Sequence, residues 1–135
     1  MLQREVVDRL VARPGTKDYG VLTIFVNAAA RVERVLTLPP GAFRPAPKVH
    51  SAVVRLTFTP SAIPAGVESV FDGMVRSMFT QRRKTLLNAL RPFATTIGAD
   101  AGAALAHARI DPGARAETLD LDRLVALAES LKPKP

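Results

Sequence analysis

The chain has 135 residues, 47% of them hydrophobic, which is enough to bury a core and argues against a disordered chain. It contains no cysteine, so disulfides and thiolate metal sites are excluded, and its two isolated histidines do not make a metal site. Nineteen basic and twelve acidic residues give a net charge of +7, which favours a polyanionic partner. No apolar run is long enough to span a membrane and the charged first residues do not resemble a signal peptide, so we expect no membrane partner. The lack of cysteine is compatible with a reducing cytoplasm.

The first sixty residues are predicted to be a mixed α/β region. Residues 1–3 look like the end of a buried strand, and residues 4–13 carry an apolar stripe with helical spacing. Residues 21–30 form an apolar run, in which only Thr23 and Asn27 are polar, and predict a buried helix. Residues 31–38 and 51–58 predict two strands that pair antiparallel at a sheet edge.

A proline-rich loop joins these two strands. Four prolines between residues 39 and 47 hold the chain extended, because each fixes its own φ and restricts the residue before it. The loop carries one aromatic residue, Phe43, and two basic residues, Arg44 and Lys48. Such a rigid loop is a candidate seat for a nucleobase and its phosphate. An ordinary connection with Phe43 in a core is the alternative.

The rest of the chain is predicted to be helical, and residues 59–66 are its linker, so we expect domains of residues 1–60 and 61–135. Periodicity and capping residues predict four helices. They are 67–78; 81–91, capped by Thr80 and stopped by Pro92; a helix from Asp100 to about Arg109; and a helix capped by Asp120 with Leu124, Leu127, Ala128 and Leu131 inward.

Three consecutive basic residues, Arg82, Arg83 and Lys84, stand at the predicted start of the second of these helices. Cations are unfavourable at the positive end of the helix dipole, so a compensating anionic partner is expected. Together with the backbone N–H groups of the helix start, these side chains would form a phosphate cradle. A solvated run of charge is the alternative interpretation.

Known catalytic motifs are absent from the sequence: it has no glycine-rich dinucleotide loop, no P-loop and no nucleophile elbow. His107 lies in an alanine-rich segment, which is more typical of a surface or packing residue than of a general base. The sequence therefore offers no catalytic residue.

Ordered stretches along the chain resemble the family of small-subunit rRNA adenine dimethyltransferases. They are residues 1–10, 15–20, 39–49 with Ser51, the run Gln81-Arg82-Arg83-Lys84-Thr85, and 110–112 through 115–117. The resemblance covers nearly the whole chain and implies the carboxyl-terminal half of such an enzyme. The implied fold is the remnant of a Rossmann-like class I methyltransferase domain, a β-hairpin plus helices, followed by a small helical rRNA-binding domain.

The family uses S-adenosylmethionine to dimethylate two adjacent adenines near the 3′ end of small-subunit rRNA. The resemblance therefore implies a cytoplasmic, usually monomeric enzyme, with small-subunit rRNA and the pre-30S particle as its partners. Phe43 matches the aromatic that clamps the target base, and Arg44, Lys48, Arg82, Arg83 and Lys84 are the expected RNA contacts. The family's glycine-rich cofactor loop and its Asn-Pro-Tyr motif would lie upstream. We therefore expect this chain alone to bind neither S-adenosylmethionine nor a metal, to be inactive, and to leave a sheet edge and an apolar helix face uncovered.

Two other functions remain open on the sequence. One is a stand-alone basic RNA-binding module without catalysis. The other is a related enzyme acting on large-subunit rRNA, which shares the proline-rich loop, although residues 81–84 and 110–112 favour the small-subunit type. The sequence departs from the family at His50, where an acidic residue is usual, and at Arg109, where a helix-ending glycine is usual.

Overall fold

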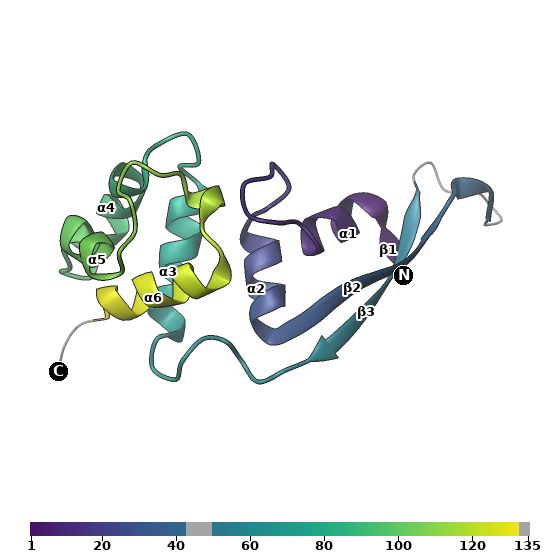
Figure 1. The fold of residues 1–135 in the computed structure, drawn as a ribbon, viewed down its shortest axis with the longest axis horizontal. Coiled ribbons are helices and arrows are strands. Elements are labelled where there is room, and N and C mark those ends of the chain that lie inside the picture. The colour runs from purple at the N-terminus through teal and green to yellow at the C-terminus, as the bar shows by residue number, and fades with distance from the viewer. Residues whose placement is uncertain (43–49, 133–135) are drawn as a thin grey trace. The chain divides into compact units, whose positions relative to one another are not determined.

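The computed structural model describes residues 1–42 and 50–132 (Figure 1). The chain divides into two compact units. The first comprises Met1–Arg13 and Asp18–Ser61, and the second comprises Pro14–Lys17 and the chain from Ala62 onward. The division after Ser61 lies beside the boundary expected near residue 60. The inclusion of Pro14–Lys17 in the second unit was not expected, and it means that the chain passes between the units three times.

The first unit contains a three-stranded antiparallel sheet in the order β1 (Leu2–Gln3), β3 (Ser51–Phe58), β2 (Ala30–Leu38). Ala30 pairs with Phe58 and Leu38 with Ser51, with a register shift between Arg34 and Leu36. The predicted antiparallel pairing of two strands is confirmed. The prediction that residues 1–3 end a buried strand is wrong for burial, because both residues of β1 are exposed, although β1 does pair with β3.

Two helices, α1 (Arg4–Leu10) and α2 (Val21–Ala29), complete the first unit. The two polar residues of α2 account for the end of α1. The Thr23 hydroxyl donates to the Arg9 carbonyl at 2.5 Å, and the Asn27 amide donates to the Leu10 carbonyl at 3.0 Å. These bonds satisfy carbonyls that the end of a helix leaves without partners. Helix α1 is shorter than the predicted 4–13. Where it ends, side chains of α2 supply the hydrogen bonds to its carbonyls.

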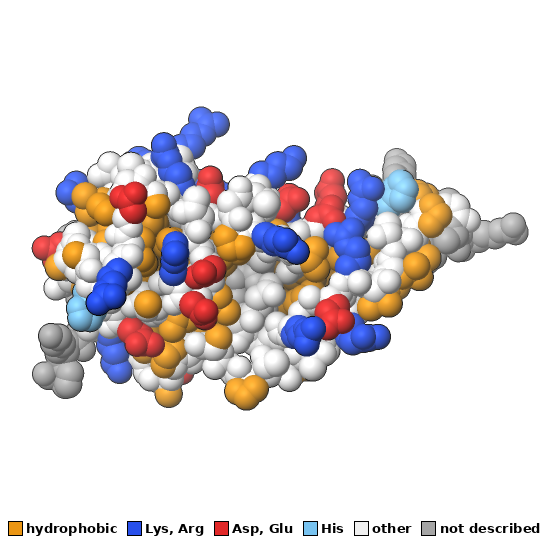
Figure 2. Space-filling view, viewed as in Figure 1, with side chains coloured by type: hydrophobic (Ala, Val, Ile, Leu, Met, Phe, Trp, Pro, Cys, Tyr) orange, Lys and Arg blue, Asp and Glu red, His pale blue; other side chains and the backbone are white. Residues whose placement is uncertain are grey.

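Apolar side chains reach the surface of the first unit. Phe58 is 79% exposed and Val35 and Leu36 are each 51% exposed, and Leu22 of α2 is also exposed. Figure 2 shows hydrophobic side chains at the surface over the strands of the hairpin. The exposed apolar surface of the described first unit therefore lies mostly on its strands, whereas Leu22 is the one exposed large apolar side chain on its helices, so the expected apolar helix face is small.

The second unit packs the helices α3 (Glu68–Phe79), α4 (Leu86–Thr96), α5 (Ala101–His107) and α6 (Leu121–Leu131) around one core. Asp120 caps α6 by accepting the Arg123 N–H at 2.9 Å, as predicted. The predicted inward residues of α6 are buried, so that prediction is confirmed. The largest fully buried side chains of the unit are Phe71, Met74, Met78, Leu86, Leu90, Leu105, Leu119, Leu124, Leu127 and Leu131.

Helix α4 differs from its prediction at both ends. It begins after Thr85, whose hydroxyl accepts the Asn88 N–H, and it continues through Pro92 to Thr96. Pro92 is exposed, so the carbonyl that its missing N–H leaves unpaired can be hydrated. Phe93 then packs closely on α3, where a Cβ built on Gly73 would lie 2.4 Å from the ring. Tertiary packing on the far side of the proline therefore keeps the chain helical.

Helices α4 and α5 end in the same hydrogen-bonding pattern, the Schellman motif. After α4, Gly98 has φ +71° and the Ala99 N–H donates to the Ala94 carbonyl at 2.8 Å. After α5, Arg109 has φ +59° and the Ile110 N–H donates to the Leu105 carbonyl at 2.9 Å. The arginine that replaces the usual glycine therefore leaves the motif intact but occupies the left-handed region, which is strained for a residue with a Cβ.

Arg109→Gly is expected to stabilise the protein by about 1 kcal/mol, because glycine adopts a positive φ without the strain of a side chain. Thermal unfolding followed by circular dichroism should show a higher midpoint. Gly98→Ala is the reciprocal control: a Cβ there meets nothing within 4 Å, so the backbone conformation alone should lower the midpoint. An unchanged midpoint for Arg109→Gly would mean that the arginine conformation carries no strain.

Candidate nucleic-acid interface

The basic run lies in the turn between α3 and α4, not at the start of a helix. The Thr80 hydroxyl donates to the Ser77 carbonyl at 2.7 Å and so closes α3, whereas Thr85 caps α4. Arg82, Arg83 and Lys84 lie between the two threonines. Figure 2 shows Lys and Arg side chains projecting over this turn. The prediction that the three basic residues open a helix is therefore wrong.

The backbone amides at the start of α4 already have partners. The Leu86 N–H donates to the Ala114 carbonyl at 2.8 Å and the Leu87 N–H donates to the Pro112 carbonyl at 3.1 Å. The next amide, that of Asn88, is bonded to the Thr85 hydroxyl. The amides at the start of α4 are therefore not available as the expected backbone part of a phosphate cradle.

Arg82 is held by several groups of the second unit. Its Nε lies 3.3 Å from the Glu117 carboxylate and its Nη1 donates to the Lys17 carbonyl at 3.3 Å. Its guanidinium carbon also lies 5.7 Å from the centroid of the Phe79 ring, within cation–π range. The side chains of Arg82 and Glu117 are only 35% and 30% exposed. Arg82 therefore has a structural function as well as its predicted role in RNA binding.

Arg83 and Lys84 differ from Arg82 because both are exposed. Neither forms an ion pair with any residue of the ranges 1–42 and 50–132. They flank a shallow hollow lined by residues 79–84. The turn thus presents two cations whose charge no carboxylate of the described chain neutralises, which suits contact with phosphates.

The other predicted site residues, Phe43, Arg44 and Lys48, lie outside the described residues, and their roles stay predictions. On either side of them, Pro40–Ala42 form a 3₁₀ turn and β3 begins at Ser51. The His50 carbonyl accepts the Arg4 N–H at 2.9 Å, and the His50 side chain is exposed. This backbone bond joins the first residue of α1 to the residue just before β3, so the role of position 50 that the structure shows does not depend on its side chain.

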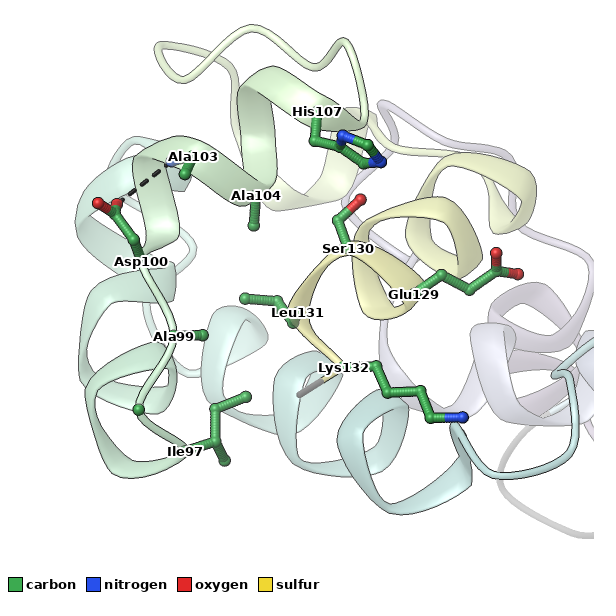
Figure 3. Close-up of a pocket in the computed structure, with 11 residues that line it drawn as sticks. Ile97, Ala99, Asp100, Ala103, Ala104, His107, Glu129, Ser130, Leu131 and Lys132 are labelled. Carbon is green, nitrogen blue, oxygen red and sulfur yellow. Dashed lines mark hydrogen bonds between the residues drawn. The ribbon is translucent and has the colours of Figure 1, made fainter. Parts of the chain in front are cut away.

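A second hollow lies between the end of α4, helix α5 and the end of α6 (Figure 3). Its apolar part includes Ile97 and Leu131, and two of its polar groups are bonded to the backbone. Asp100 caps α5 by accepting the Ala103 N–H, and the Ser130 hydroxyl donates to the Ala126 carbonyl. His107 is exposed at its rim, as expected for a surface residue. Nothing in this arrangement resembles a general acid–base pair.

Within the described ranges, no group of three or more His, Cys, Asp or Glu side chains could hold a metal ion. No helix in that part of the chain is long and apolar enough to cross a bilayer.

A model of the family described as ribosomal RNA adenine dimethylase matches residues 1–132. Among curated proteins, the ribosomal RNA small subunit methyltransferase A of Acidobacterium capsulatum is 47% identical over 135 residues, and that of Pseudomonas aeruginosa is 46% identical over 136 residues. The two alignments cover 99% and 100% of this chain but 47% and 48% of the relatives. The chain therefore spans about half the length of the curated relatives it matches.

Solved structures also resemble the chain. The crystal structure of a dimethyladenosine transferase from Plasmodium falciparum matches with a TM-score of 0.74 and 25% identity, over 93% of this chain and 53% of that one. The structure of the 23S rRNA methyltransferase ErmE matches with a TM-score of 0.60 and 24% identity, over 97% and 52%. The second likeness is one of fold alone. The elements of this chain therefore follow a fold found in methyltransferases.

The different environments of the three basic residues predict different effects on stability. Arg82→Ala should destabilise the second unit by about 1–2 kcal/mol, because it removes a half-buried ion pair and a hydrogen bond to the Lys17 carbonyl. Arg83→Ala and Lys84→Ala are the matched controls and should unfold like the unchanged protein. Equal unfolding midpoints for all variants would show that the contacts of Arg82 contribute nothing to the fold.

Proposed function

Because the chain belongs to the ribosomal RNA adenine dimethylase family, we propose that it is the carboxyl-terminal half of an enzyme that dimethylates adenines of small-subunit rRNA. The observation that carries the proposal is the 46–47% identity to small-subunit methyltransferases over essentially the whole chain. The coverage of only about half of each relative supports a half-enzyme. The proposed substrate is two adjacent adenines near the 3′ end of the rRNA, within the pre-30S particle in the cytoplasm.

The sequence identities to the relatives support action on the small subunit over the alternative of action on large-subunit rRNA. The relatives that are 46–47% identical to the chain over the aligned residues are named as methyltransferases of the small subunit. The 23S rRNA methyltransferase ErmE shares 24% and is similar in fold only. The completed enzyme is proposed to act as a monomer, like most of the family.

In this proposal the first unit recognises the target base. The exocyclic amine of adenine is a weak nucleophile, because its lone pair is shared with the ring, so the base must leave its stack and be aligned with the methyl donor. Phe43 would stack on the extruded ring, and Arg44 and Lys48 would contact the adjacent phosphates. The upstream half would cover the apolar surface of the hairpin, including Phe58.

The second unit would bind the surrounding RNA through its basic turn. Arg83 and Lys84 are exposed and without an ion pair in the described chain, so both are available for phosphates. Arg82, the third predicted contact, would touch RNA only with the part of its guanidinium that Glu117 and Lys17 leave open. Binding of this kind fixes the position of the RNA without reading its sequence.

The described residues do not fit a site for S-adenosylmethionine, which supplies an electrophilic methyl group in the full-length family. The one described junction that leads directly from a strand into a helix, from β1 into α1, has Gln3 and Arg4 where a cofactor loop needs glycines. We therefore propose that the upstream half holds the donor and that this chain alone is inactive.

The proposal is tested by joining the chain to the amino-terminal half of the Pseudomonas aeruginosa relative. The joined protein is expected to transfer labelled methyl groups from S-adenosylmethionine to unmethylated small-subunit particles, and the chain alone is expected to transfer none. Phe43→Ala should lower the rate at least about tenfold, whereas Phe43→Tyr keeps a stacking ring and should retain most of it.

Three results would contradict parts of this proposal. Methyl transfer by the chain alone would contradict the half-enzyme. Full activity of Phe43→Ala would remove the base-clamp role. An inactive joined protein, together with salt-dependent RNA binding by the chain alone, would instead favour the alternative of a stand-alone RNA-binding module.

A further inference from the structure

A closed circuit of three contacts holds the segment 15–17 against the basic turn. The Gly15 N–H donates to the Glu117 carbonyl at 2.6 Å, and Arg82 Nη1 donates to the Lys17 carbonyl at 3.3 Å. The Glu117 carboxylate and Arg82 Nε, 3.3 Å apart, close the circuit. All four residues belong to the second unit. Both ends of the segment are therefore fixed by two residues that also hold each other.

The circuit is well suited to fixing a backbone. A guanidinium presents its donors in a rigid plane, so the bond from Nε to Glu117 sets the direction of the bond from Nη1 to Lys17. The pair is about two-thirds buried, which reduces screening by solvent. Gly15 has φ +89°, a conformation that a residue with a side chain rarely adopts, and this lets the chain turn into the segment.

The side chain of Lys17 is free to act because the circuit uses only its carbonyl. Lys17 is exposed and forms no ion pair within residues 1–42 and 50–132. Its backbone lies at the guanidinium of Arg82, the first residue of the basic run. Lys17 thus adds an un-neutralised cation to those of Arg83 and Lys84, although it is far from them in the sequence.

We propose that Lys17 is a further phosphate contact of the RNA-binding surface, and that Arg82 and Glu117 act as positioning residues that hold it there. The proposal rests on the proposed function, since it takes RNA as the ligand. Several cations from two separate loops match the repeated charges of a nucleic-acid backbone. Glu117 places a carboxylate within a basic surface. That position is explained by its two bonds, because its carboxylate pairs with Arg82 and its backbone carbonyl accepts the Gly15 N–H.

The first experiment measures binding of the full chain to a labelled RNA containing the 3′-terminal region of small-subunit rRNA, over a range of salt concentrations. Lys17→Ala should weaken binding by about fivefold near 100 mM salt and reduce the slope of log affinity against log salt by about one. Lys132→Ala, which removes an exposed lysine at the end of α6, should leave the slope unchanged. Circular dichroism should show that both variants are folded.

The second experiment tests the positioning. Glu117→Ala removes both a negative charge and the side-chain acceptor of Arg82 Nε, so simple electrostatics predicts tighter RNA binding, whereas loss of the circuit predicts weaker binding. In the Glu117→Ala background, Lys17→Ala should then cost less than about twofold, because its cation is no longer fixed. If Glu117→Ala does not fold, Arg82→Lys replaces it, since a lysine keeps the charge but cannot bridge both acceptors.

The outcomes separate this inference from the proposed function. An unchanged chain that binds no RNA even at low salt overturns the RNA-binding role and this inference with it. If the unchanged chain binds RNA and Lys17→Ala binds it with the same affinity and the same salt slope, the proposed contact by Lys17 is overturned but the RNA-binding role is not. An equal effect of Lys17→Ala with and without Glu117 overturns the positioning role.

Discussion

The two hydrogen bonds of Arg82, to the Glu117 carboxylate and the Lys17 carbonyl, are the constraint on which the basic surface of the second unit depends. They join three stretches that are far apart in the sequence. Because the ion pair is still one-third exposed, its contribution to stability is on the order of 1 kcal/mol. Its larger effect is on position: a planar donor group with two fixed acceptors restricts both the turn and the segment before α2. The bonds of Arg82 thus help to fix the positions of the other two basic residues of the turn, Arg83 and Lys84.

The loop after α5 complements this arrangement from the other side. The carbonyls of Pro112 and Ala114 accept the first amides of α4, so the start of that helix is satisfied by protein and has no amides left for an anion. Arg83 and Lys84 nevertheless lie just before Thr85, near the positive end of the helix dipole. Glu117 pairs with Arg82 and not with either of them. No carboxylate within residues 1–42 and 50–132 therefore pairs with Arg83 or Lys84, which favours contact of their side chains with a polyanion.

Local patterns in the sequence predicted the parts of the fold that local physics decides. The strands of the hairpin and the caps of α5 and α6 followed from periodicity and from Asp100 and Asp120. The start of α4 did not, because Thr80 and Thr85 are both plausible caps and the choice depends on carbonyls of the distant 112–114 loop. The prediction that Pro92 stops the helix was wrong for a similar reason, because the packing of Phe93 on Gly73 is a tertiary contact. In the candidate site, the sequence grouped Arg82 with Arg83 and Lys84. Only the structure distinguishes Arg82, and the participation of Lys17 had no signal beyond its place in a family-like stretch.

The division of the chain into two units does not coincide with a single break in the sequence. A truncated protein beginning at Ala62 would keep every helix of the second unit but would lose Gly15 and Lys17. The carbonyl of Glu117 and Nη1 of Arg82 would then bond to water instead of to a fixed backbone, and the surface would also lose the cation of Lys17. Such a fragment could keep its core and yet present a different set of charges. The segment Pro14–Lys17 is covalently part of the first half of the sequence and structurally part of the second unit. The basic surface of the helical unit is therefore built partly from the sequence between α1 and α2, so a boundary near residue 60 does not describe this unit completely.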